Sequence, residues 1–96
     1  MSEIDVKGLS QALLSLKDAT EVERFLRDLL TPGEAKSLSE RWRVARLLDE
    51  GGHSYRDISQ LTGASTTTVT RVARFLSQEP HQGYRLVLNR LKETQS

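Results

Sequence analysis

Apolar residues recur every three or four positions along almost the whole chain, and no stretch alternates apolar and polar residues for long enough to indicate a strand. This spacing places apolar side chains on one face of an α-helix. We therefore predict an all-α fold with six helices. In chain order, their apolar faces are formed by Val6, Leu9, Leu13 and Leu16; Val22, Phe25, Leu26, Leu29 and Leu30; Leu38, Trp42, Ala45 and Leu48; Tyr55, Ile58 and Leu61; Val69, Val72, Ala73 and Leu76; and Tyr84, Val87, Leu88 and Leu91.

Polar residues and glycines mark the ends of these helices. Three pairs have the spacing of a capping box, in which two polar side chains three residues apart each accept a hydrogen bond from the other residue's backbone N–H. We expect Ser65 to cap the fifth helix, and Gly51 and Gly52 to end the third. The three predicted boxes are Thr20 with Glu23, Thr31 with Glu34 and Ser54 with Asp57.

The fourth and fifth predicted helices, at about residues 54–76, have the layout of a helix-turn-helix. Between them, Gly63 can adopt the left-handed backbone conformation that a short turn between helices needs. Ile58 is expected to face inward, and the small Ser59 lets the second helix cross closely over the first. The spacing therefore predicts two helices that cross at a tight turn.

The length and composition of the chain limit its class. With 96 residues and no cysteine, we expect one domain over residues 1–96, without disulfides or cysteine-bound zinc, in the cytoplasm. No apolar run approaches the roughly 20 residues of a membrane span, so no membrane partner is expected. One tryptophan, two phenylalanines and two tyrosines make a thin single-chain core. We therefore expect a homodimer held largely by the N-terminal helices, with Trp42 in the core or at the interface.

Charge is distributed unevenly along the chain. Residues 1–40 contain five basic and eight acidic residues, whereas residues 41–74 contain six basic and three acidic ones. All six basic residues of the second stretch are arginine, whose planar guanidinium suits phosphates and guanine edges. This indicates a nucleic-acid partner, although solvated arginines on helix surfaces would explain the charge alone equally well.

A run of threonines, Thr66 to Thr68 followed by Thr70, occupies the first turns of the second helix of the motif. Threonine forms helices poorly, at a cost of about 0.5 kcal/mol per residue relative to alanine. The N-terminal residues of a recognition helix face base edges, where threonine offers a hydroxyl and a methyl group. An exposed turn of indifferent composition is the alternative. The predicted DNA-contacting residues are Arg56, Ser59, Thr66, Thr67, Thr68, Thr70 and Arg74.

We expect neither enzymatic activity nor a metal site. Gly51 and Gly52 lack the further glycines and the lysine of a phosphate loop, and His53 and His81 have the positions of ordinary turn residues. Two function classes stay open: a sequence-specific DNA-binding regulator, and a helical protein-interaction module that uses the motif as a docking surface. The acidic charge of residues 1–40 favours the second class.

Five short motifs together resemble the tryptophan repressor family, in a match without gaps from about Leu29 to Arg71. The resemblance implies six helices in an intertwined homodimer, with the helix-turn-helix in the fourth and fifth. It also implies double-stranded DNA as the partner and repression at a twofold-symmetric operator. The motifs are Leu30-Thr-Pro-Gly-Glu34, Arg41-Trp-Arg43, Ser54-Tyr-Arg-Asp57, Gly63-Ala64 and Thr68-Val-Thr-Arg71.

The same resemblance implies a co-repressor site. Arg41 and Arg71 match the two arginines that flank the bound indole in that family, and Thr31 matches a contact to the amino acid. Val72 stands where the family has a glycine beneath the ligand, and Phe75 where it has a serine. Because added volume disfavours the ligand, we expect that no cofactor is required and that free L-tryptophan is ineffective. The alternatives are a tryptophan-dependent repressor of amino-acid biosynthesis genes and a regulator that responds to another small molecule.

Overall fold

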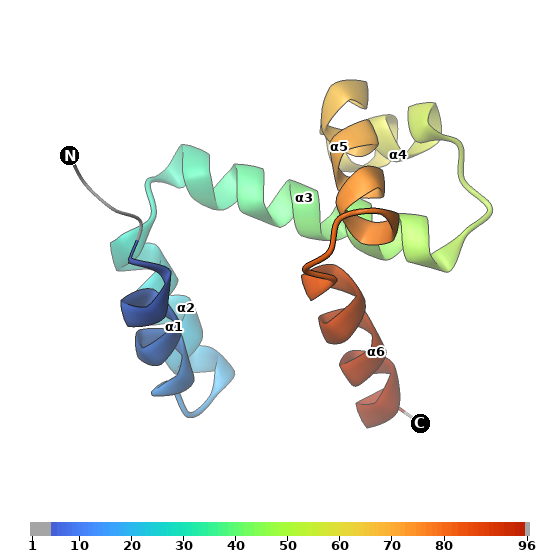
Figure 1. Ribbon diagram of the computed structural model, residues 1–96. Helices are drawn as coiled ribbons and strands as arrows, with labels where there is room; N and C mark the ends of the chain where they lie inside the picture. Colours follow the sequence, from blue (N-terminus) through green and yellow to red (C-terminus); the bar gives the residue numbers. More distant parts are fainter. Residues whose placement is uncertain (1–4, 96) are drawn as a thin grey trace. The chain divides into compact units, whose positions relative to one another are not determined.

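The computed structural model describes residues 5–95 and confirms the all-α prediction, with helices and no strand in that range (Figure 1). The described residues form two compact units, one up to Ala35 and one from Lys36 onward. The prediction of one domain over residues 1–96 concerns folding cooperativity and stays a prediction. The helices are α1 (Val6–Leu14), α2 (Ala19–Leu29), α3 (Pro32–Glu50), α4 (Tyr55–Thr62), α5 (Thr66–Ser77) and α6 (Gly83–Gln95).

Two of the three predicted capping boxes form. Thr31 and Glu34 exchange backbone-to-side-chain hydrogen bonds of 2.9 and 3.1 Å at the start of α3, and Ser54 and Asp57 do the same at the start of α4. The hydrogen bond from the Thr31 backbone N–H and, to a smaller extent, the one from its hydroxyl lower the pKa of the Glu34 carboxyl. Both helices therefore begin where the sequence pattern places them.

The predicted box of Thr20 with Glu23 is wrong, because α2 begins earlier. Asp18 is the N-cap residue, and its carboxylate accepts a hydrogen bond of 2.9 Å from the backbone N–H of Glu21. The Glu21 carboxylate in turn accepts from the backbone N–H of Lys17 at 2.9 Å. Aspartate caps a helix at least as well as threonine does, so the earlier site prevails.

The first unit contains α1 and α2, and neither helix has a buried residue. Several of the predicted apolar positions are open to solvent: Leu9, Leu13 and Leu29 are each more than 40% exposed, and Val6 is 59% exposed. Val22, Phe25 and Leu26 of α2 are partly buried, so the apolar faces of the two helices are only partly covered within this unit.

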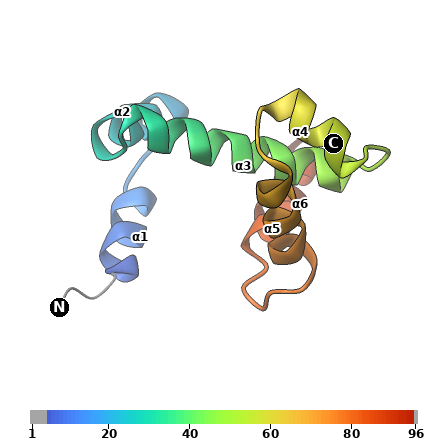
Figure 2. The same cartoon turned by 90° about the horizontal axis from the view of Figure 1, so that it is seen from above.

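The second unit contains the core. Figures 1 and 2 show α4, α5 and α6 gathered around the second half of α3. Trp42, Leu47, Leu48 and Tyr84 are partly buried and pack against this core, in agreement with the prediction for Trp42. The buried cluster consists of Val44 and Ala45 from α3, Ile58 from α4, Ala64 from the turn, and Val69 and Val72 from α5.

The buried side of α4 differs from the predicted stripe. Ile58 is fully buried as expected, but Tyr55 and Leu61 are 46% and 54% exposed. The second buried residue is Thr62, which lies one turn after Ile58 on the same face. Its hydroxyl donates to the carbonyl of Ile58 at 2.8 Å and accepts from the N–H of Ala64 at 3.1 Å. A polar residue takes the core position because both of its hydrogen-bonding roles are satisfied there.

Candidate nucleic-acid interface

The turn of the helix-turn-helix is fixed by Gly63 and Ser59. Gly63 has φ +82°, and its N–H donates to the carbonyl of Ser59 at 2.9 Å. A Cβ at this position would meet Oε2 of Glu40 at 3.3 Å, the far end of a flexible side chain. The left-handed backbone, rather than lack of space, is therefore what requires glycine.

Ser59 lies inside this turn. Its side chain is partly buried, and its hydroxyl donates to the carbonyl of Ala64 at 2.6 Å. The hydroxyl proton is thus used within the protein. Of the predicted DNA-contacting residues, Ser59 has the environment of a residue that shapes the turn.

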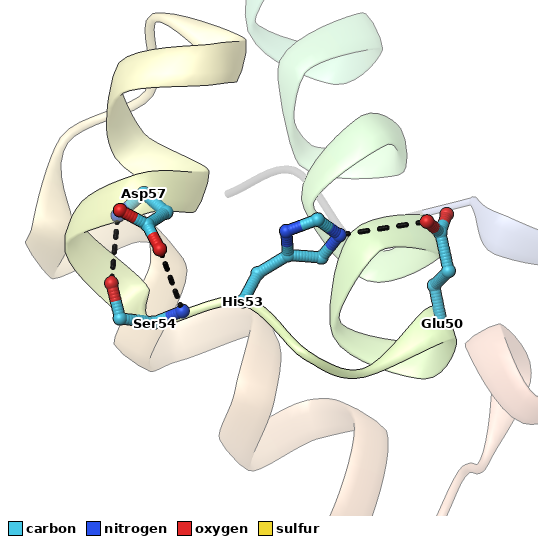
Figure 3. A network of polar contacts seen from close by, with 4 residues as sticks. All are labelled: Glu50, His53, Ser54 and Asp57. Carbon is cyan, nitrogen blue, oxygen red and sulfur yellow. Dashed lines mark hydrogen bonds and ion pairs between the residues drawn. The ribbon is translucent and has the colours of Figure 1, made fainter.

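The loop before α4 carries a second set of polar contacts, drawn in Figure 3. Gly51 and Gly52 both have φ +81° and end α3, as predicted. His53 follows them, with its Nε2 3.5 Å from Oε1 of Glu50, and the Ser54–Asp57 box comes next. These contacts fix the start of α4 next to the end of α3, which agrees with the interpretation of His53 as a turn residue.

Ser65 is the N-cap residue of α5, the second helix of the helix-turn-helix, as predicted. The hydroxyl of Ser65 accepts from the N–H of Thr68 at 3.1 Å and donates to Oγ1 of Thr68 at 3.0 Å. Thr66, Thr67 and Thr70 are exposed, whereas Thr68 is partly buried. The threonine run therefore lies at the N-terminal end of a capped helix with three of its four side chains open to solvent.

The exposed face of α5 continues from threonine into arginine. Thr67, Arg71 and Arg74 are four and three residues apart, so they share one face, and all three are exposed. The opposite face carries Val69 and Val72, which are buried. One side of α5 thus faces the core, and the other presents polar and cationic groups along its whole length.

The remaining predicted DNA contact, Arg56, lies exposed on α4, in its first turn. It belongs to the same unit as the exposed face of α5, and α4 contacts α5 directly. The structure therefore brings the sequence-predicted arginines and threonines onto one compact helix-turn-helix.

A helix-turn-helix of this kind has counterparts among known proteins. The sequence matches the family model described as Trp repressor protein over residues 5–92. The chain belongs to the Trp repressor family. This confirms the resemblance inferred from the five motifs, and the match extends to both sides of them.

Several known proteins are similar to this one over most of the chain. A protein described as the uncharacterized protein YerC, from Bacillus subtilis (strain 168), is 46% identical over 92 residues, which is 96% of this chain and 86% of that protein. A Trp operon repressor homolog from Photobacterium profundum is 33% identical, covering 91% of this chain and 81% of the homolog. The crystal structure of a TrpR like protein from Eubacterium eligens ATCC 27750 has 44% identity and a TM-score of 0.84, covering 95% of this chain and 92% of that chain.

The co-repressor contacts expected of a Trp repressor family member lie in both units. Thr31 is exposed in the first unit, where its hydroxyl accepts the capping hydrogen bond from Glu34. In the second unit, Arg41 is partly buried on α3 and Arg71 is exposed on α5. The Arg71 guanidinium lies over the ring of Phe75, with Cζ 4.4 Å from the ring centroid.

The two departures from the Trp repressor family pattern have different environments. Val72 is 1% exposed and forms part of the core, so its three carbons fill the helix-turn-helix interior. Phe75 is partly buried and lines an open apolar cavity of about 430 Å³ with Trp42, Tyr84 and Val87. Phe75 presents its ring beside Arg71. The prediction that Val72 and Phe75 disfavour a bound ligand stays a prediction.

Metal-binding clusters and membrane-spanning helices are both missing from the described part of the chain. Within residues 5–95, no three histidine, aspartate or glutamate side chains are grouped so that they could hold a metal ion. No helix in the same range is both long and apolar enough to cross a membrane.

Proposed function

We propose that this protein is a sequence-specific DNA-binding transcriptional regulator, a repressor that binds a twofold-symmetric operator as a homodimer. The observation that carries the proposal is the exposed face of α5, where Thr67, Arg71 and Arg74 follow one another on a helix anchored by its buried side. Membership of the Trp repressor family supports it. A protein that regulates genes works beside the chromosome, so the proposal places it in the cytoplasm, as expected of a regulator with bacterial relatives.

In this proposal the threonines specify sequence and the arginines position the protein. Thr66 and Thr67 are exposed in the first turn of α5, the part of a recognition helix that reaches base edges in the major groove. Arg56 and Arg74 are exposed on α4 and α5 and carry charge suited to backbone phosphates. In this proposal, Ser59 and Thr68 support the DNA-contacting residues through their hydrogen bonds within the helix-turn-helix.

The exposed apolar residues of α1 and α2 support the homodimer. Neither helix has a buried residue, yet each carries leucines at helical spacing. A second copy of the chain that covers these residues would remove apolar surface from water at about 25 cal/mol per Å². Sedimentation at micromolar concentration tests this step, and a stable, well-folded monomer would contradict it.

We further propose that the protein binds its operator without tryptophan. The ring of Phe75 already lies against the guanidinium of Arg71, at 4.4 Å. A ligand that stacks on the same arginine face would have to displace this ring. The regulator is then ligand-independent or responds to another small molecule.

The test is an electrophoretic shift on genomic fragments with excess unrelated competitor DNA. Retardation of particular fragments that survives the competitor supports the proposal. The rival function, a protein-interaction module, is favoured by the acidic charge of residues 1–40 and predicts no retardation even at low salt. Sequencing the retained fragments identifies the operator.

A further inference from the structure

We infer that Phe75 is a positioning residue that holds the guanidinium groups of Arg71 and Arg74 in place for binding to DNA phosphates. The inference rests on the proposed function and gives Phe75 a role in DNA binding. Cζ of Arg71 lies 4.4 Å from the ring centroid of Phe75, and Cζ of Arg74 lies 5.4 Å from it. Both distances are within the roughly 6 Å over which a cation is attracted to an aromatic face. One ring thus contacts both cations of the exposed face of α5.

Phe75 is less exposed than the two arginines. It is partly buried and lines the same cavity as Trp42 and Tyr84, which pack against the core, whereas Arg71 and Arg74 are exposed. The cation–π contacts therefore hold two exposed guanidinium groups against a partly buried ring. An arginine that is restrained before binding loses less conformational freedom when it reaches a phosphate.

An aromatic ring also restrains an arginine without neutralising its charge. The carboxylate of Glu79 provides the contrast, since its Oε2 lies 3.8 Å from Nε of Arg74 and offsets part of the local positive charge. A cation–π contact leaves the guanidinium N–H groups at its edge available for phosphate oxygens. The contact with Phe75 therefore restrains both arginines without itself reducing their charge.

The experiment compares Phe75→Leu and Phe75→Tyr in the full chain, with a DNA fragment retained by the unchanged protein and with unrelated duplex DNA. Leucine keeps an apolar side chain at the cavity but has no aromatic face, whereas tyrosine keeps the ring. We expect Phe75→Leu to weaken binding to both DNAs about 2- to 10-fold, because the loss of each exposed cation–π contact lowers the affinity by only a few-fold. Phe75→Tyr should bind as the unchanged protein does. The active fraction of each variant is measured by stoichiometric titration, so that loss of folded protein is not counted as loss of affinity.

Salt dependence separates positioning from direct contact. Phe75→Leu keeps both arginines, so the slope of log affinity against log salt should stay the same, whereas Arg74→Ala should lower it by about 1. In a protein that already carries Arg71→Ala and Arg74→Ala, Phe75→Leu should have no further effect. Tyr84→Leu is the packing control, because it removes another ring from the same cavity. It should change thermal stability and leave the affinity of the folded protein unchanged.

The outcomes are distinct. If the unchanged protein binds no DNA, the proposed function fails and this inference fails with it. If the unchanged protein binds and Phe75→Leu binds equally well, only the positioning role is overturned. The same holds if Phe75→Leu weakens binding as much without the two arginines as with them. Weaker DNA binding by Phe75→Tyr than by the unchanged protein would also overturn the positioning role.

Discussion

Asp49 on α3 accepts a hydrogen bond of 2.6 Å from Arg85 on α6, and its second carboxylate oxygen lies 2.7 Å from Nζ of Lys92. The Asp49 side chain is only 9% exposed, whereas that of Lys92 is 60% exposed, so water screens the lysine more strongly. The hydrogen bonds of Lys92 and of Arg85 lower the pKa of the Asp49 carboxyl. This contact fastens α6 to α3.

We predict that Asp49→Asn lowers the free energy of unfolding by about 1 kcal/mol at pH 7, because a charged hydrogen-bond acceptor for two cations is lost. Denaturant unfolding measures this. The matched control is Glu23→Gln, which breaks the Arg27 pair on α2, where both side chains are more than two thirds exposed. That substitution should have little effect, and an equal loss in both variants would contradict the special role of Asp49.

The contribution of Asp49 should depend on pH in one direction. Because its folded-state pKa is lowered, the contribution is fully present above the ordinary carboxyl pKa of about 3.9 and is lost as the pH falls through the folded-state value. The stability difference between the unchanged protein and Asp49→Asn should therefore be constant from pH 7 to about pH 5 and shrink below about pH 4. A difference that grew on acidification would show that the carboxylate is not stabilised by its partners.

We expect Gly63→Ala to destabilise the fold by about 1 kcal/mol, because alanine is strained at φ +82°. Gly33→Ala is the matched control, since Gly33 lies within α3 and a Cβ there would meet nothing within 4 Å. That change should stabilise the helix by up to about 1 kcal/mol. Thermal unfolding of the two variants should shift in opposite directions, and a neutral Gly63→Ala would exclude the left-handed requirement.

Thr67→Ala and Arg74→Ala should affect DNA binding differently. Loss of a base contact by Thr67→Ala should change the preference at one base pair by about 1–3 kcal/mol, while leaving unrelated DNA unaffected. Loss of a phosphate contact by Arg74→Ala should weaken binding to all sequences and lower the salt slope. Affinities for a set of single-base operator variants distinguish the two. Uniform weakening by both substitutions would contradict base readout by the threonines.

Free L-tryptophan should bind poorly and leave operator affinity unchanged, because Phe75 occupies the face of Arg71. Titration calorimetry, together with DNA binding with and without the amino acid, measures this. Phe75→Ser removes the ring from Arg71 and is measured beside the unchanged protein, to test whether the ring is what excludes tryptophan. Micromolar binding of tryptophan by the unchanged protein, coupled to tighter DNA binding, would refute the prediction.

The sequence by itself determined the helices and the turn. The apolar period of three to four residues, the boxes at Thr31 and Ser54, and the glycine at position 63 act over a few neighbouring residues, so they can be recognised without knowing the fold. Two boundaries were wrong. The start of α2 was misplaced because Asp18 and Thr20 compete for the same cap, and α1 ends at Leu14 although Leu16 continues its apolar spacing. The threonines and arginines could likewise be predicted as DNA contacts, because the position of a residue within a helix-turn-helix can be read from neighbouring residues alone.

Only the tertiary structure decided which side chains meet across helices. Thr62 is buried because its hydroxyl is satisfied by groups that the fold brings to it, and Val72 is buried in the core between α3, α4 and α5. Asp49 and Arg85 are 36 residues apart in sequence, and no local pattern marks them as partners. Such contacts depend on how helices pack, and many sequences with the same apolar period could place different polar residues there.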